Sequence, residues 1–405
     1  MEKNYRRNLL ALMISWVVWV PFTSMTRSYS QLFQKELGAS PFIISLISFT
    51  FTLTFAFSKI FGGYITDKYG RRKILVRTTF LAAFSSLIYA IASDWKIILI
   101  GSIINGLALL YQPALRSIIA DSTKIEYRGR TYALINFIPN LLSSFSPLFA
   151  VYLISIYNLV FAVRLMYILS FIGGIMAGII RLLFIRETFE GGIKTVSLIK
   201  SYKDAVLFVK RSLFSIVFLK FFMSAGYALS ILKAYYVVYF LNLSSEDWGY
   251  FMFLGLLAGF IASIPIGFIV DKIGRKYSLS LSTFLCFSGS ILLYIAPLEG
   301  NSLYFIVLTS IIVCNIGFSG SFSAFPALLM DLTPVDKRGR VNTLMSILED
   351  VIAAFMGLLA GYIYEVYNPR MPFLISAFSY LIGFTIVVFF IRETMGLRRK
   401  ISEIY

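Results

Sequence analysis

Apolar runs of about 20 residues recur along the whole 405-residue chain, and short clusters of charge separate them. Stretches such as "LMISWVVWVPF" and "FTIVVFFI" are apolar on every face, whereas the strands of a membrane barrel alternate polar and apolar positions. About 20 apolar residues are enough for a helix to cross a bilayer. The pattern predicts an all-α polytopic membrane protein with spans at residues 9–33, 41–62, 74–93, 97–119, 132–155, 160–184, 213–241, 248–269, 278–297, 302–329, 342–364 and 371–391.

One long polar stretch divides these twelve predicted spans into two sets of six. It reads "RETFEGGIKTVSLIKSYKDAVLFVKR" and lies at the middle of the chain. The predicted organisation is an N-terminal six-helix bundle (1–185), a cytoplasmic linker (186–211), a C-terminal six-helix bundle (212–394) and a cytoplasmic tail (395–405).

Composition and charge agree with a membrane location. Hydrophobic residues make up 58% of the chain and charged residues 14%, and the mean hydropathy is +0.81, which excludes a soluble fold. Most of the 37 lysines and arginines fall on the side of the two termini, and the opposite turns hold Arg27, Lys35, Lys96 and Arg370. The positive-inside rule therefore predicts an integral protein of the cell membrane with both termini in the cytoplasm. The net charge of +17 then reflects topology and lipid contact, so no nucleic-acid partner is expected.

Little in the sequence indicates a cofactor or catalysis. The chain has no histidine, and its two cysteines, Cys286 and Cys314, lie inside apolar runs. Neither a metal site nor a disulfide is expected. No nucleophile–base pair or nucleotide loop is visible, so we expect no enzyme and no cofactor.

A charged turn is written twice. "GYITDKYGRRK" (63–73) follows the second predicted span, and "GFIVDKIGRK" (267–276) follows the eighth. "DSTKIEYRGR" (121–130) returns as "DLTPVDKRGR" (331–340), and "IRET" occupies both 185–188 and 391–394. A unit of six spans has an even number of crossings, so its two copies must lie parallel in the membrane.

This pattern resembles the major facilitator superfamily (MFS). Its marks are two parallel sets of six spans, with G-x-x-x-D-K-x-G-R-[RK] after the second and eighth. The resemblance covers essentially the whole chain and implies a transporter that works by alternating access, with its solute site between the halves.

The resemblance also implies that the doubled turn latches the cytoplasmic side. The latch residues would be Asp67, Arg71, Asp271 and Arg275. Gly63 and Gly267 would allow close helix approach, and Gly70 and Gly274 would supply positive φ. Similarity to sugar-porter members extends this to a charge network at Asp121, Glu126, Arg128, Arg130, Glu187, Asp331, Asp336, Arg338, Arg340 and Glu393.

Ionisable residues at membrane depth are candidates for coupling or binding. Glu349 and Asp350 lie about 15 Å along the eleventh span, where a carboxylate can carry a proton or form a static ion pair. Arg164 and Lys220 are further candidates. The expected substrate cavity draws on Arg27, Asn105, Tyr111, Gln112, Asn136, Asn140, Tyr227, Lys233, Tyr236 and Asn315.

These residues predict a monomeric, proton-coupled secondary transporter of a small solute, with basic cavity residues that favour an anionic or polyhydroxy substrate. The alternative is a proton-coupled exporter of multiple drugs or hydrophobic cations, with Glu349 or Asp350 as the cation partner. Two antiporter patterns are degraded, to "SIING" (102–106) and "NLLSSFSPLFA" (140–150), which weakens that alternative. A non-transporting membrane sensor is the alternative of another class, although 186–211 and 395–405 are short for a signalling domain.

Overall fold

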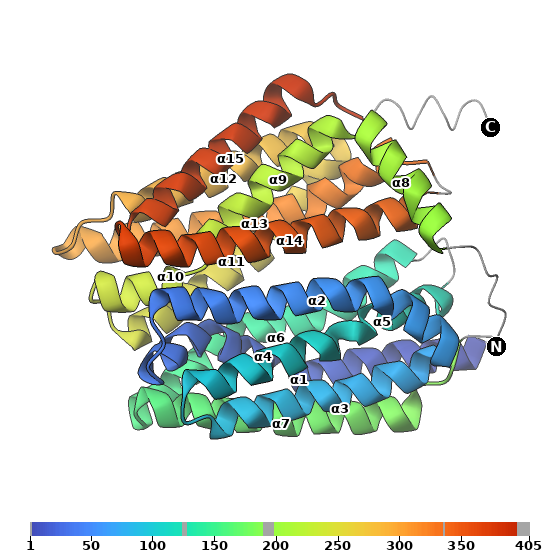
Figure 1. The fold of residues 1–405 in the computed structure, drawn as a ribbon, viewed down its shortest axis with the longest axis horizontal. Coiled ribbons are helices and arrows are strands. Elements are labelled where there is room, and N and C mark those ends of the chain that lie inside the picture. Colours follow the sequence, from blue (N-terminus) through green and yellow to red (C-terminus); the bar gives the residue numbers. More distant parts are fainter. Residues whose placement is uncertain (1, 124–127, 189–197, 335–336, 395–405) are drawn as a thin grey trace. The chain divides into compact units, whose positions relative to one another are not determined.

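A computed structural model describes residues 2–123, 128–188, 198–334 and 337–394. Inside these ranges, the description leaves out the side chains of 2–6, 67, 128–130, 132–134, 198–202 and 301. All regular structure in the described ranges is helical, and twelve helical spans, two of them built from three consecutive helices, are long and apolar enough to cross a membrane (Figure 1). The prediction of an all-α protein with twelve spans is confirmed.

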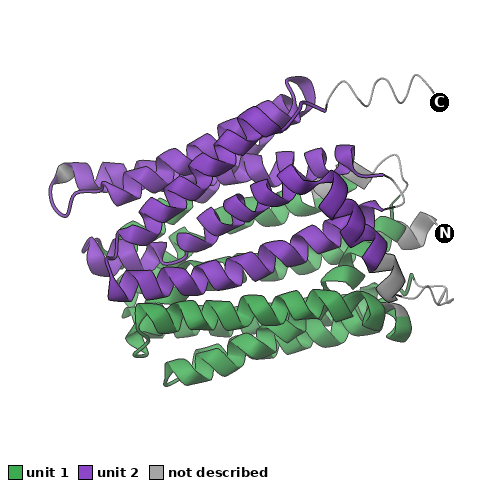
Figure 2. Cartoon of the chain, turned by 45° about the horizontal axis from the view of Figure 1, so that its top comes forward, with its two compact units in different colours: residues 1–194, 244–253 green, residues 195–243, 254–405 purple. Residues whose placement is uncertain are grey.

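Two compact units divide the chain (Figure 2). Unit 1 comprises residues 1–194 and 244–253, and unit 2 comprises residues 195–243 and 254–405. The first six spans are formed by α1 (Glu2–Glu36), α2 (Pro41–Tyr69), α3 (Arg71–Ile91), α4 (Trp95–Ala108) with η1 (Leu109–Tyr111) and α5 (Gln112–Asp121), α6 (Arg128–Ile156), and α7 (Leu159–Phe184).

The remaining elements begin with α8 (Leu198–Ser212), which packs against its neighbours in unit 2, α9 and α14. The last six spans are formed by α9 (Phe214–Leu229) with α10 (Lys233–Tyr235) and the π-helix η3 (Tyr236–Phe240), α11 (Ser245–Lys272), α12 (Arg275–Tyr294), α13 (Asn301–Leu332), α14 (Arg338–Val366), and α15 (Met371–Phe390). The separate linker at 186–211 stays a prediction.

Local chemistry explains where several of these helices start and break. Ser40 and Asn158 accept from backbone N–H groups and so cap the starts of α2 and α7. Pro113 has no N–H, and the carbonyl of Leu109 accepts from Gln112 instead, which produces the 3-10 turn η1 inside the fourth span.

Five of the six spans of each unit pack by the same scheme. In unit 1, α7 packs against α1 and α3, α1 packs against α6, and α3 packs against α4. In unit 2, α15 packs against α9 and α12, α9 packs against α14, and α12 packs against α13. The repeat seen in the sequence is therefore a repeat of helix packing.

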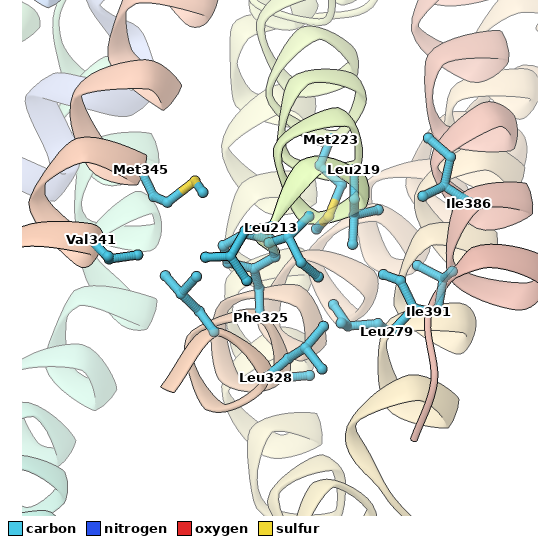
Figure 3. Close-up of a cluster of buried hydrophobic side chains, with 14 of the residues drawn as sticks. Leu213, Leu219, Met223, Leu279, Phe325, Leu328, Val341, Met345, Ile386 and Ile391 are labelled. Carbon is cyan, nitrogen blue, oxygen red and sulfur yellow. The ribbon is translucent and has the colours of Figure 1, made fainter. Parts of the chain in front are cut away.

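The core of unit 2 shows what these contacts bury (Figure 3). Leu219 and Met223 of α9, with Leu213 just before this helix, meet Phe325 of α13 and Met345 of α14, and all five are buried. Helices in a bilayer associate mainly through close side-chain packing, because apolar lipid provides no hydrophobic driving force between them. This packing fixes the rotation of each helix about its own axis. The fixed rotations decide which polar side chains meet.

Candidate functional site

In the first unit, Glu187 connects the "IRET" segment to the charged turn. Its carboxylate accepts from the backbone N–H groups of Arg71 (3.2 Å) and Arg72 (3.0 Å), and so caps the start of α3. Gly70 precedes this helix with φ of 91°, and an added Cβ would lie 2.9 Å from the Glu187 carboxylate. The Arg71 guanidinium forms an ion pair with Asp121, at the end of α5. The charged turn, the end of the fourth span and the segment after the sixth are thus tied together.

The second unit repeats this arrangement. Glu393 accepts from the N–H groups of Arg275 (3.1 Å) and Lys276 (3.0 Å) at the start of α12. Gly274 has φ of 136°, and an added Cβ would collide with the Glu393 carboxylate. Arg275 forms a buried ion pair with Asp331 (3.0 Å), which also accepts from Thr394 (3.1 Å). The need for positive φ at both glycines is confirmed.

Two further pairs of basic residues occupy equivalent positions in the two units. Their contacts could not be predicted from the sequence. Arg72 donates to the carbonyl of Leu182 and Lys276 to that of Val388, each at 2.7 Å near the end of the last span of its unit. At the opposite helix ends, Arg164 donates to the Ala92 carbonyl and Arg370 to the Ala296 carbonyl, both at 2.8 Å. These four contacts satisfy helix-end carbonyls, so Arg164 has a structural role.

The close helix approach predicted at Gly63 and Gly267 is not seen among the described residues. Both lie inside helices, and in the described part of the chain an added Cβ at either position would meet no atom within 4 Å. The close approach occurs instead at Gly62, where an added Cβ would lie 2.9 Å from the Leu110 carbonyl beside the break in the fourth span.

The expected latch acids make no described contact with the arginines. Asp271 is exposed in the last turn of α11, and the Asp67 side chain lies outside the described residues. Of the remaining network candidates, Glu126 and Asp336 lie outside the described residues, as do the side chains of Arg128 and Arg130. Arg338 donates to the Thr333 carbonyl (3.1 Å), and Arg340 is half-buried.

An ion pair lies at membrane depth in unit 2. The Lys220 ammonium of α9 is 2.8 Å from a carboxylate oxygen of Glu349 of α14. It also lies 4.6 Å from the centre of the Phe325 ring of α13. The Lys220 side chain is 13% exposed, whereas Glu349 is 46% exposed. Asp350 follows on α14 and is half-buried. Glu349 is thus a carboxylate with an internal counter-ion and an open side.

The cavity candidates fall into different environments. Tyr236 is fully buried, and its hydroxyl donates to the Leu293 carbonyl (3.1 Å), so it is a packing residue and its predicted cavity role is wrong. Tyr111 is buried too, inside unit 1. Asn315 donates to Ile311 of its own helix (2.8 Å). Arg27, Asn136, Asn140 and Tyr227 are exposed, and Asn105, Gln112 and Lys233 are half-buried.

Arg181 is a functional candidate that the sequence did not single out. Its side chain in α7 is 0% exposed and donates to Thr79 Oγ1 (2.7 Å) and Ser15 Oγ (3.1 Å). Its guanidinium carbon lies 5.6 Å from the ring centre of Tyr111, beside the break in the fourth span. The one feature of the sequence that could have indicated Arg181 is its position near the end of an apolar run. A basic residue at such a position is ordinarily interpreted as a topology signal that stops translocation. Lys59, over the Phe55 ring of α2 (4.1 Å), was missed in the same way.

Twelve spans, packed as two equivalent units with charged residues inside, define a polytopic membrane transporter. The sequence model of the Major Facilitator Superfamily matches residues 8–351 and 213–403. The chain belongs to this superfamily, and it is a transporter and not an enzyme.

Several individual proteins are similar. The "Na(+), Li(+), K(+)/H(+) antiporter" of Planococcus maritimus is 29% identical over 146 residues, which cover 35% of this chain and 33% of the antiporter. "Multidrug resistance protein 2" of Bacillus subtilis (strain 168) is 21% identical over 369 residues, or 87% of each chain.

Two solved structures share the fold. The nucleoside transporter NupG matches 95% of this chain and 100% of its own, with a TM-score of 0.77 and 13% identity. The human organic anion transporter MFSD10 matches 95% of this chain and 99% of its own, with a TM-score of 0.66 and 13% identity.

Proposed function

We propose that this chain is a proton-coupled secondary transporter that moves a small solute by alternating access, and that Glu349 carries the proton. The observation that supports this proposal is the 2.8 Å pair between Lys220 and Glu349. Glu349 lies 11 residues after the start of α14, or about 16 Å along the helix, where an ionisable residue is costly unless it has a function.

The pair has two states that a proton can interconvert. With Glu349 charged, its carboxylate holds the Lys220 ammonium; with Glu349 protonated, the attraction is lost and the ammonium is free to move. Glu349 shares its surroundings with Lys220 from α9, Phe325 from α13 and the neighbouring Asp350. A local pair of this kind can bias a conformational equilibrium only if the two conformations differ in their affinity for the proton.

The ion networks at the ends of the units would serve the same movement. Arg71 and Arg275 each pair with an acid of their own unit, and such pairs stiffen a bundle so that it rocks as one body. We retain Asp67 and Asp271, with these arginines, as the proposed cytoplasmic latch. We also propose a monomer in the cell membrane with cytoplasmic termini.

The anionic or polyhydroxy substrate expected from Arg27 and Lys233 stays a proposal. A second candidate function is exchange of a cation for protons, and the Lys220–Glu349 pair favours it, because the carboxylate already holds a cation. The sequence similarity to an antiporter and to a multidrug resistance protein supports the same candidate. The likeness to nucleoside and organic anion transporters supports the fold alone.

Reconstitution tests the proposal. Liposomes that contain the purified protein and a trapped pH-sensitive dye are exposed in turn to alkylammonium salts, sodium or potassium salts, organic acids and nucleosides. Proton movement evoked by at least one class, and absent from protein-free liposomes, is the expected result. Solute counterflow without any proton movement would show a transporter that is not coupled to protons.

A further inference from the structure

Lys220 resembles a ligand that is tethered in a binding site. Its ammonium lies between the Glu349 carboxylate (2.8 Å) and the face of the Phe325 ring (4.6 Å to the ring centre). These two groups come from α14 and α13, whereas the lysine comes from α9. Three separately packed helices therefore meet around one positive charge.

The two groups around this charge are those that recognise ammonium ions. A carboxylate forms a charge-assisted hydrogen bond with an N–H donor, and an aromatic face attracts a cation within about 6 Å. Phe325 is 5% exposed and belongs to the buried core of unit 2, so its orientation is held by packing (Figure 3). Glu349 is 46% exposed and provides the open side.

We propose that Glu349 and Phe325 form a binding site for an alkylammonium solute, and that the Lys220 ammonium occupies this site when the solute is absent. The inference rests on the proposed transport function and names the substrate class of the same carboxylate. An arriving ammonium compound displaces Lys220 from Glu349, and a proton competes for the same oxygen atoms. Solute and proton are then exchanged for one another.

The surroundings favour an organic ammonium ion over a bare metal cation. Hard inorganic cations require several oxygen ligands, whereas the described contacts of the Lys220 ammonium are with one carboxylate and one aromatic ring. Apolar side chains make up the adjoining core, including Leu219 and Met345. An aliphatic chain attached to the ammonium group would lie beside this apolar surface.

Chemical rescue tests the site directly. Lys220→Ala removes a fragment that corresponds to n-propylammonium, so this compound is the probe. We expect it to raise the thermal unfolding midpoint of purified Lys220→Ala in a saturable manner, whereas n-propanol and sodium chloride do not. Lys233→Ala, which removes another lysine of the same span, serves as the matched control and should show no rescue. Rescue should also be lost in the double variant Lys220→Ala/Glu349→Gln.

An equal shift in Lys233→Ala, or no shift in Lys220→Ala, would overturn the inference. If Lys220→Ala does not fold, the wild-type protein supplies the test through modification of Glu349 by dicyclohexylcarbodiimide, read by mass spectrometry. Triethylammonium, which carries one N–H donor, should slow this modification several-fold more than sodium does, and equal rates would contradict the site. Both readouts are independent of transport, so the inference can fail while proton coupling survives, and the reverse also holds.

Discussion

The carboxylate of Glu187 accepts a hydrogen bond from the backbone N–H of Arg71, although 116 positions separate the two residues. Glu393 makes the same contact with Arg275 in the other unit (3.1 Å). Each contact joins the end of a six-span unit to the turn between its second and third spans. The repeated "IRET" and "GRR" or "GRK" segments are therefore two sides of one cap, which is why they recur together.

Glycine-to-alanine substitutions should distinguish the glycines that require positive φ from those that lie inside helices. Gly70→Ala and Gly274→Ala place a Cβ against the capping glutamate at positive φ, so each should lower the unfolding free energy by about 1 to 3 kcal/mol. Gly63→Ala and Gly267→Ala meet open space inside helices and should be neutral or stabilising by up to about 1 kcal/mol. Thermal unfolding of the four purified variants measures this. Equal losses at all four positions would refute the capping geometry.

We expect a double-mutant cycle on the buried Arg181 and its acceptor Thr79 to give non-additive changes in unfolding free energy. Thr79→Val removes the acceptor of a buried guanidinium and should cost about 1 to 3 kcal/mol. Arg181→Met should be tolerated better, and it should abolish the effect of Thr79→Val in the double variant. Thr78→Val is the control, because Thr78 bonds only to the Ile74 carbonyl in the described structure. An additive double variant would mean that the two residues do not interact.

The proposed orientation predicts which turns face the cytoplasm. Lys68 and Lys272 are exposed in the two copies of the charged turn, whereas Lys96 lies at the start of α4, near the opposite ends of the helices. Each of these lysines is replaced by cysteine in turn. The native Cys286 and Cys314 are buried. A membrane-impermeant maleimide should label Lys96→Cys in intact cells and the other two only after permeabilisation. Labelling of all three variants in intact cells would contradict cytoplasmic termini.

Sequence patterns predicted the twelve spans, their division into two repeated sets, and the positive φ of Gly70 and Gly274. These features depend on the length of apolar runs and on local turn chemistry, both of which are visible in the residue order. Side-chain partners were harder to predict. The sequence pattern predicts a latch between Arg71 and Asp67, whereas the structure pairs Arg71 with Asp121. Tyr236 was placed in a cavity and is buried.

The reason lies in helix rotation. A span that is apolar on every face gives no sign of which side meets lipid and which side meets another helix. Lys220 and Glu349 were both recognised as charges at membrane depth, but their pairing follows from the rotations of α9 and α14, which close packing determines. The same rotations hide Arg181 among α1, α3 and α7.

The most direct measurement is solute-evoked proton movement in liposomes that contain Glu349→Gln. The account predicts that this variant loses at least about tenfold of the coupled proton flux, because glutamine cannot take up or release the proton. Glu365→Gln, on the same helix near its far end, should behave as the wild type. Wild-type proton flux in Glu349→Gln would contradict the central claim that this carboxylate couples transport to protons.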